Sequence, residues 1–85
     1  MFYTYILKCA DDTLYVGSTN KLKRRLLEHN NSKRGAHYTK IRRPVVVVYV
    51  EEYKTVNEAL KRELEIKSWN RKEKLALIES NPKTN

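Results

Sequence analysis

The sequence predicts a single small α+β domain (an α/β sandwich), in which a three-stranded antiparallel sheet is flanked by helices in the order β-β-α-β-α-α. Three observations lead to this prediction. The chain of 85 residues has room for one domain and not for two. Aromatic and β-branched residues gather in three short runs, and two later segments begin with residues that cap helices. Residues 1–80 are expected to form the domain, and residues 81–85 a flexible C-terminal tail.

The first two strands are expected to form an antiparallel hairpin. Phe2–Cys9 (FYTYILKC) and Leu14–Ser18 (LYVGS) are rich in residues that favour strands. Ala10–Thr13 has the composition of a turn, because aspartate side chains hydrogen-bond to the nearby backbone. Gly17, near the end of the second strand, indicates a place where another group comes close to the backbone.

A helix and a third strand follow the hairpin. Thr19 or Asn20 can cap a helix that runs to about Asn30. Residues 31–43 are polar, basic and interrupted by a glycine, which indicates a loop that includes a short helical turn. Val45–Val50 (VVVVYV) is continuously apolar, so this strand should be covered on both faces, with helices on both sides of the sheet.

Two helices complete the domain. Thr55-Val56-Asn57-Glu58 matches a capping box, in which a threonine and a glutamate three residues later each satisfy a free backbone N–H. This helix should run to about Trp69. Asn70-Arg71-Lys72-Glu73 is a second start of the same kind, for a final helix that ends near Glu79.

The positive charge is concentrated in one segment. The chain carries a net charge of +8, and residues 20–44 hold nine basic residues against Glu28 alone. A cationic cluster of this kind attracts the phosphates of a polyanion, so we expect a nucleic-acid partner. The residues expected to bind it are Lys21, Lys23, Arg24, Lys33, Arg34, Lys40, Arg42 and Arg43.

The composition also excludes several classes of protein. Cys9 is the only cysteine, which excludes an internal disulfide framework and a multi-cysteine metal site and leaves it as a small buried apolar residue. No run approaches the roughly 20 apolar residues that span a bilayer, and the N-terminus lacks a signal-peptide pattern. The expectation is a cytoplasmic monomer without a membrane partner.

Four polar side chains are candidates for one site near the hairpin. Arg25 and His29 lie one turn apart on the basic helix, at the border of its apolar side formed by leucines 22, 26 and 27. Tyr5 and Tyr15 lie on the two hairpin strands. Because side chains alternate across a strand, these tyrosines share a face only if the hairpin loop has an odd number of residues or a bulge.

Glu63 is the fifth candidate, because it falls at the centre of the apolar side of its helix. That apolar side is expected to consist of Val56, Ala59, Leu60, Leu64 and Ile66, with Glu58, Lys61, Arg62 and Glu65 on the solvated side. A carboxylate on a buried face needs a cation or hydrogen-bond donors. Lys67, one turn on, can supply that cation as a structural ion pair. Alternatively, Glu63 binds one divalent metal ion, with Mg²⁺ favoured.

These residues together resemble the GIY-YIG nuclease domain. The resemblance rests on Tyr3-Thr4-Tyr5, on Tyr15-Val16-Gly17, and on the spacing of Arg25, His29 and Glu63 behind them, and it covers the chain from Tyr3 to about Ile78. The ALKRE motif at 59–63, followed by Ile66-Lys67, and the RRP sequence at 42–44 are most similar to the small stand-alone bacterial members, an uncharacterised protein family. The superfamily also includes the N-terminal nuclease domain of an excinuclease.

The resemblance implies a metal-dependent endonuclease with Tyr5, Tyr15, Arg25, His29 and Glu63 as catalytic residues. Glu63 would bind Mg²⁺ or Mn²⁺, and one of the tyrosines would accept a proton from the attacking water. The positive charge of Arg25 and of the metal is expected to lower the pKa of that tyrosine. His29 would position the water or relay its proton.

The substrate is expected to be DNA rather than RNA, in DNA repair or recombination, with little sequence specificity. Two alternatives stay open. The chain can be a nucleic-acid-binding module that uses the basic segment without cutting, or a component of a larger repair or ribosomal assembly.

Overall fold

The computed structural model describes residues 1–31, 34 and 36–80. The predicted tail at 81–85 and the candidate nucleic-acid ligand Lys33 lie outside these residues. Within these residues, three strands and four helices follow one another as β-β-α-α-β-α-α. This is the predicted order, with the short helical turn expected in the basic loop present as α2. The elements are β1 (Phe2–Cys9), β2 (Leu14–Thr19), α1 (Leu22–Asn31), α2 (His37–Lys40), β3 (Val45–Tyr53), α3 (Val56–Lys67) and α4 (Arg71–Ser80).

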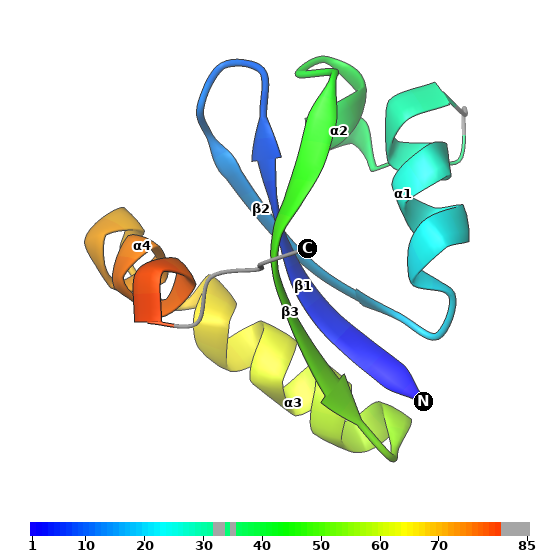
Figure 1. Ribbon diagram of the computed structural model, residues 1–85, viewed down its shortest axis with the longest axis vertical. Helices are drawn as coiled ribbons and strands as arrows, with labels where there is room; N and C mark the ends of the chain where they lie inside the picture. Colours follow the sequence, from blue (N-terminus) through cyan, green and yellow to red (C-terminus); the bar gives the residue numbers. More distant parts are fainter. Residues whose placement is uncertain (32–33, 35, 81–85) are drawn as a thin grey trace.

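The sheet has the strand order β2-β1-β3, and both pairs are antiparallel. β1 is therefore the central strand, and β2 is an edge strand. In Figure 1, α1 and α2 lie on one side of the sheet, and α3 and α4 lie on the other. This arrangement confirms the predicted α+β class and the prediction that helices pack on both faces of the sheet.

The hairpin loop places the two candidate tyrosines on the same face. The backbone N–H of Cys9 donates to the carbonyl of Thr13 at 2.9 Å, so three residues close the turn. The last of them, Asp12, has φ = 68°, the left-handed geometry usual in a three-residue hairpin loop. In the resulting register Tyr5 is opposite Gly17 and Leu7 is opposite Tyr15. The odd loop length that the shared face requires is therefore present.

Two small cores lie on the two faces of the sheet. Under α1 and α2 the buried residues are Tyr5, Leu7, Cys9 and Val45. Under α3 and α4 they are Ile6, Val16, Tyr49 and Ile66. The pairing of β1 with β3 shifts by one residue between Ile6 and Leu7, which leaves Val48 as the extra residue of a bulge. The continuous valine run therefore contributes side chains to both cores.

The helix caps predicted for α3 and α4 are present. The Thr55 hydroxyl accepts from the Glu58 N–H, and the Glu58 carboxylate accepts from the Thr55 N–H. Asn70 and Glu73 form the same reciprocal pair at 2.8 and 2.9 Å. Each pair satisfies backbone N–H groups that a helix start leaves unpaired, which is why α3 and α4 begin where the sequence predicts.

The predicted apolar sides of two helices are partly wrong. On α3, Ala59 and Ile66 are buried, whereas Val56, Leu60 and Leu64 are 47%, 44% and 70% exposed. Leu27, assigned to the buried side of α1, is 63% exposed. In both helices fewer apolar residues are buried than the sequence pattern suggests. Each helix packs on one face of a sheet of only three strands, so the sheet covers only a narrow side of the helix.

Arg62 corrects the predicted solvated side of α3. Its guanidinium donates to both carboxylate oxygens of Glu51 on β3, at 2.9 and 3.1 Å, and lies over the ring of Trp69. The hydroxyls of Tyr49 and Tyr53 also donate to Glu51. Arg62 therefore ties α3 to the sheet rather than facing solvent.

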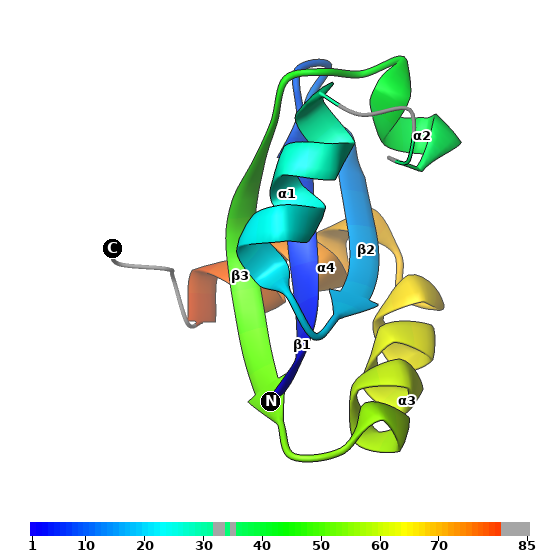
Figure 2. The same cartoon turned by 90° about the vertical axis from the view of Figure 1, so that its right-hand side faces the viewer.

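In Figure 2, α1 lies in front of the sheet beside the edge strand β2, and α3 lies near the lower end of this strand. Side chains from both helices can therefore reach this edge. Within residues 1–31, 34 and 36–80, no helix has the length and apolar content that crossing a membrane requires.

Candidate active site

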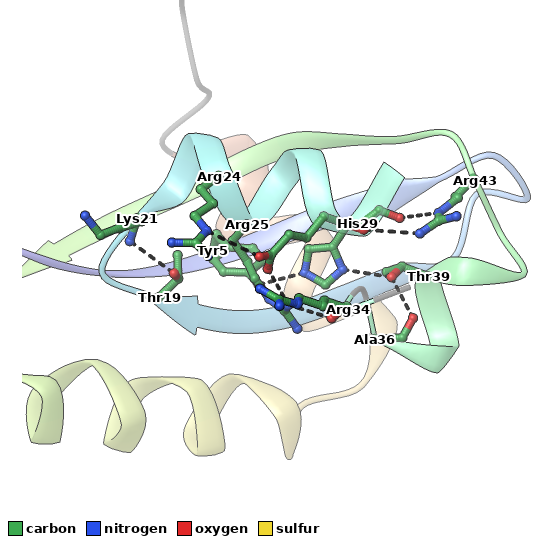
Figure 3. Close-up of polar contacts among 11 residues, drawn as sticks. Tyr5, Thr19, Lys21, Arg24, Arg25, His29, Arg34, Ala36, Thr39 and Arg43 are labelled. Carbon is green, nitrogen blue, oxygen red and sulfur yellow. Dashed lines mark hydrogen bonds and ion pairs between the residues drawn. The ribbon is translucent and has the colours of Figure 1, made fainter. Parts of the chain in front are cut away.

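Tyr5 and His29 form the buried centre of the site. Tyr5 is 2% exposed on the central strand, and its ring crosses the neighbouring Gly17 of β2. Its hydroxyl oxygen lies 2.9 Å from Nε2 of His29 on α1. Figure 3 shows the His29 ring between Tyr5 and Thr39. The sheet and the basic helix thus meet in one buried hydrogen bond between two candidate residues.

His29 is fully buried, although its position at the border of the apolar side predicted a place at the margin. The Tyr5, Tyr15 and α2 side chains enclose it, and Nδ1 lies 2.8 Å from the Thr39 hydroxyl oxygen. Burial, followed by the charge of Arg25, lowers the pKa of His29 to about 4. The imidazole is therefore neutral near pH 7.

The electrostatics of Tyr5 differ from the prediction. Burial, with a smaller contribution from Tyr15, raises the pKa of Tyr5 to about 12. Arg25 does lower that pKa, as predicted, but burial outweighs its effect. The phenol is therefore protonated at neutral pH, and it can take up a proton only if it gives up its own at the same time.

Arg25 lies one helical turn before His29, and its side chain is 28% exposed. Nη1 donates to Glu28 at 2.8 Å and to the carbonyl of Arg34 at 2.9 Å (Figure 3). The carboxylate and the carbonyl hold the guanidinium beside Tyr5 while leaving part of it open to solvent. An arginine held in this way can present its remaining N–H donors to a phosphate.

Tyr15 lies on the same face as Tyr5 and contributes ring contacts. Its ring centroid is 5.2 Å from that of His29 and 5.8 Å from that of Tyr38 on α2. Arg42 in turn lies over the Tyr38 ring, 3.9 Å from its centroid. Tyr15 is only partly buried. Its ring therefore lies between the buried His29 and the surface formed by the basic segment.

Glu63 reaches the edge strand from the opposite face. Its side chain is 14% exposed, and one oxygen accepts from the Ser18 hydroxyl of β2 at 2.6 Å. The other oxygen pairs with Lys67 at 2.6 Å, which is the structural ion pair that the sequence allowed as an alternative. Its charge raises the pKa of Tyr5, after several larger effects, so the two groups interact across β2.

The residues present fit a single divalent ion bound by one carboxylate. Within the described ranges no three His, Cys, Asp or Glu side chains are grouped as a metal cluster. Mg²⁺ does not need such a cluster, because it commonly binds one or two carboxylates together with water and substrate phosphates. Glu63 can serve in that way once Lys67 gives up its carboxylate oxygen.

The candidate nucleic-acid ligands divide into two groups. Arg42 pairs with Asp11 at 3.1 Å and donates to the Tyr38 carbonyl, and Arg43 donates to the carbonyls of Glu28 and His29 at the end of α1. These two arginines thus contribute to the fold. The exposed members of the set are Lys21, Lys23, Arg24, Arg34 and Lys40.

Two side chains of the site were not among the predicted residues. Ser18 donates to Glu63, and Thr39 contacts the second nitrogen of His29. Thr39 lies ten residues after His29 and on a different helix, so no helical or strand spacing connects them. Only the folding of α2 back onto α1 brings the two side chains together.

Comparison with known proteins gives one consistent result. The family model described as the GIY-YIG catalytic domain matches residues 1–76. A UPF0213 protein of Syntrophus aciditrophicus is 52% identical over 80 residues, which cover 94% of this chain and 92% of that protein. The UPF0213 protein SSP2268 of Staphylococcus saprophyticus is 54% identical over 76 residues, which cover 89% and 92%.

Solved structures agree with the sequence matches. The solution NMR structure of the UPF0213 protein BH0048 from Bacillus halodurans is 35% identical, with a TM-score of 0.62 over 95% of this chain and 86% of that one. The solution NMR structure of EF2693 from E. faecalis is 39% identical, with a TM-score of 0.62 over 92% and 82%. The resemblance seen in the tyrosine motifs is thereby confirmed, and the chain belongs to the GIY-YIG family, with UPF0213 proteins among its relatives.

Proposed function

We propose that this protein is a metal-dependent endonuclease that hydrolyses DNA phosphodiester bonds in DNA repair or recombination. The family is a nuclease family, and one observation in this chain supports retained catalysis. A buried phenol and a buried neutral imidazole share a 2.9 Å hydrogen bond beside a partly exposed arginine. Ordinary packing does not require two polar rings to meet there, whereas proton transfer does.

Tyr5 and His29 can act together as a proton relay in which the two proton transfers are coupled. As water attacks the phosphorus atom, its proton passes to Tyr5 Oη and the tyrosine proton passes to His29 Nε2. This coupling removes the need for a free tyrosinate, which the raised pKa of Tyr5 makes unfavourable. Since the pKa of His29 is lowered to about 4, its Nε2 is free to receive a proton at neutral pH.

Arg25 and Glu63 would act on the phosphate from the two sides of β2. The exposed part of the Arg25 guanidinium can donate to the non-bridging oxygens, where negative charge increases in the transition state. Glu63 is the residue that would hold the divalent ion. Such an ion, when bound, supplies Lewis-acid stabilisation of the phosphate and of the leaving oxygen.

The test is nicking of supercoiled plasmid and of branched DNA in the presence of Mg²⁺. We expect Glu63→Ala and Arg25→Ala each to lower the rate by at least about 100-fold, the scale of losing one electrostatic stabiliser. The matched controls are Glu52→Ala and Arg71→Ala, which change exposed residues of like charge away from the site. Nicking that survives both site variants would identify a contaminant and refute the proposal.

The Glu63–Lys67 ion pair favours a second candidate function. A carboxylate that a lysine already neutralises at 2.6 Å is a normal structural feature, and the basic segment can bind DNA or RNA without it. A binding module would show salt-dependent affinity that Mg²⁺ and Glu63→Ala leave unchanged. Mg²⁺-dependent cleavage that is lost in Glu63→Ala would exclude this candidate.

A further inference from the structure

Thr39 occupies the far side of the His29 ring from Tyr5. It is fully buried on α2, and its hydroxyl oxygen lies 2.8 Å from His29 Nδ1 and 2.9 Å from the carbonyl oxygen of Ala36 (Figure 3). Four groups therefore form one continuous chain of hydrogen bonds: the phenol, the imidazole, the threonine hydroxyl and a backbone carbonyl.

The direction of each hydrogen bond in this chain follows from its last member. A carbonyl oxygen can only accept, and a hydroxyl has one hydrogen, so the Thr39 hydrogen points to Ala36. The Thr39 oxygen must then accept from His29, which places a hydrogen on Nδ1. In a neutral imidazole the other nitrogen, Nε2, is therefore unprotonated and accepts from the Tyr5 hydroxyl.

The opposite tautomer would reverse the chemistry at Tyr5. With its hydrogen on Nε2, His29 would donate to Tyr5 and could not receive the tyrosine proton. Its Nδ1 lone pair would then face the Thr39 oxygen, and the Thr39 hydrogen would have to turn from Ala36 to Nδ1. The Ala36 carbonyl would keep its two backbone N–H donors, but its oxygen would lie 2.9 Å from the Thr39 hydroxyl oxygen with no hydrogen between them. Two oxygens at hydrogen-bond distance repel each other when no hydrogen lies between them, so the surroundings of Thr39 select one tautomer.

We propose that Thr39 is a positioning residue that fixes the tautomer of His29 and thereby makes Tyr5 the donor in their shared hydrogen bond. Its importance for catalysis rests on the proposed nuclease function, but the tautomer itself does not. The contacts that hold α2 in place include the Tyr38 ring against Tyr15, and Arg42, which lies over Tyr38 and pairs with Asp11 in the hairpin loop. The basic segment thus has a role inside the site as well as on the surface.

The direct test is the tautomer of His29, read from ¹⁵N chemical shifts of the histidine ring nitrogens near pH 7. His37→Gln removes the signals of the other histidine and leaves those of His29. We expect hydrogen on Nδ1 in the wild type. A wild-type spectrum with hydrogen on Nε2 would overturn the proposal without any further variant.

Three variants extend the test. Thr39→Val keeps the shape but removes the hydroxyl, and we expect the Nε2–H form to become the major one. Thr39→Ser should keep the wild-type tautomer. Thr4→Val is the matched control, because Thr4 is also fully buried and its hydroxyl also donates to a carbonyl, that of Ala59, at 2.8 Å. An unchanged tautomer in Thr39→Val, or an equal shift in Thr4→Val, would refute the assignment.

Cleavage rates separate this proposal from the proposed function. We expect kcat of Thr39→Val to fall by about 10-fold or more with KM little changed, and kcat to recover in Thr39→Ser. If the wild type does not cleave, the nuclease proposal fails, and the tautomer assignment is still decided by the spectra. If the wild type cleaves and Thr39→Val cleaves as fast, the positioning role is wrong.

Discussion

The hydroxyl oxygen of Tyr5 lies 2.5 Å from the point at which a Cβ atom on Gly17 would stand, and the ring carbon that bears it lies 2.7 Å away. Gly17→Ala should therefore push the Tyr5 ring off its hydrogen bond with His29. Since both rings are buried, we expect a loss of about 1–3 kcal/mol in the free energy of unfolding, as for other overpacked cores. Urea denaturation measures this loss, and cleavage should fall with it.

A double variant distinguishes this steric cause from a general loss of strand stability. Tyr5→Phe removes the closest atom, so Gly17→Ala should cost less in the Tyr5→Phe background than in the wild type. We expect a coupling energy of at least about 0.5 kcal/mol between the two positions. Strict additivity would mean that the cost of the alanine does not come from the phenol.

His29 should make the stability of the fold depend on pH below neutrality. Its pKa is about 4 in the folded protein against 6.5 as the ordinary value, so the unfolded chain binds the extra proton. The free energy of unfolding should therefore fall as the pH is lowered from 6.5 to 4, by up to about 3 kcal/mol. Urea denaturation at pH 7, 5.5 and 4.5 measures this fall.

In the upper part of that pH range, the change in the free energy of unfolding with pH comes from His29 rather than from the carboxylates. The Arg25 hydrogen bond lowers the pKa of Glu28, and the Arg62 hydrogen bond lowers that of Glu51 against the opposing effect of burial. The contribution of both carboxylates is present above their ordinary value of 4.5 and is lost below it. Between pH 5 and 6.5, His29→Gln should remove the slope and His37→Gln should keep it. A slope that persists in His29→Gln would contradict the prediction.

The sequence predicts this fold well wherever a local rule decides the structure. Alternation and turn composition identify the hairpin, and reciprocal Thr–Glu and Asn–Glu pairs mark the starts of α3 and α4. The sequence alone could not predict that Tyr5 and Tyr15 share a face. It predicted only that they would do so if the hairpin loop had an odd number of residues or a bulge. Whether Asp12 adopts left-handed geometry, and so closes a three-residue turn, is not fixed by its residue type.

The sequence predicts least where tertiary packing chooses among several apolar residues. On α3 the aliphatic residues Val56, Leu60 and Leu64 form a regular pattern, yet Ala59 and Ile66 are the ones buried. Hydrophobicity alone favours the larger residues, whereas the close approach of the helix to β1 requires a small residue at Ala59, whose carbonyl accepts from Thr4. Contacts between separate segments, such as His29 with Thr39, have no sequence signal at all.

Lys67 should compete with a divalent ion for Glu63. Its ammonium occupies one carboxylate oxygen at 2.6 Å and is 45% exposed, so its removal should cost little stability and free that oxygen. We expect Lys67→Ala to bind Mg²⁺ several-fold more tightly than the wild type. An NMR titration that follows the Ser18 and Glu63 amide resonances measures this affinity without any DNA.

The control for this titration is Lys61→Ala, which removes an exposed lysine from the same helix. It changes the net charge equally, so it reports the general electrostatic effect of losing one positive charge. Equal Mg²⁺ affinities in the two lysine variants would mean that Lys67 does not compete with the ion for Glu63. Glu63→Gln should abolish the titration shifts in either background.

The basic segment should contain both surface ligands and structural arginines. Lys21 and Lys23 are exposed, whereas Arg43 donates to the carbonyls of Glu28 and His29 at the end of α1. If the lysines bind phosphates, Lys21→Ala with Lys23→Ala should reduce the slope of log affinity against log salt by about 0.9 for each phosphate no longer neutralised, leaving stability unchanged. Arg43→Ala should instead lower the free energy of unfolding by about 1–3 kcal/mol, because two partly buried carbonyls lose a charged donor. Fluorescence anisotropy across salt concentrations, together with urea denaturation of the same variants, separates the two effects. If Arg43→Ala instead reduces the salt slope as much as the lysine variant does and leaves the free energy of unfolding unchanged, Arg43 is a phosphate ligand.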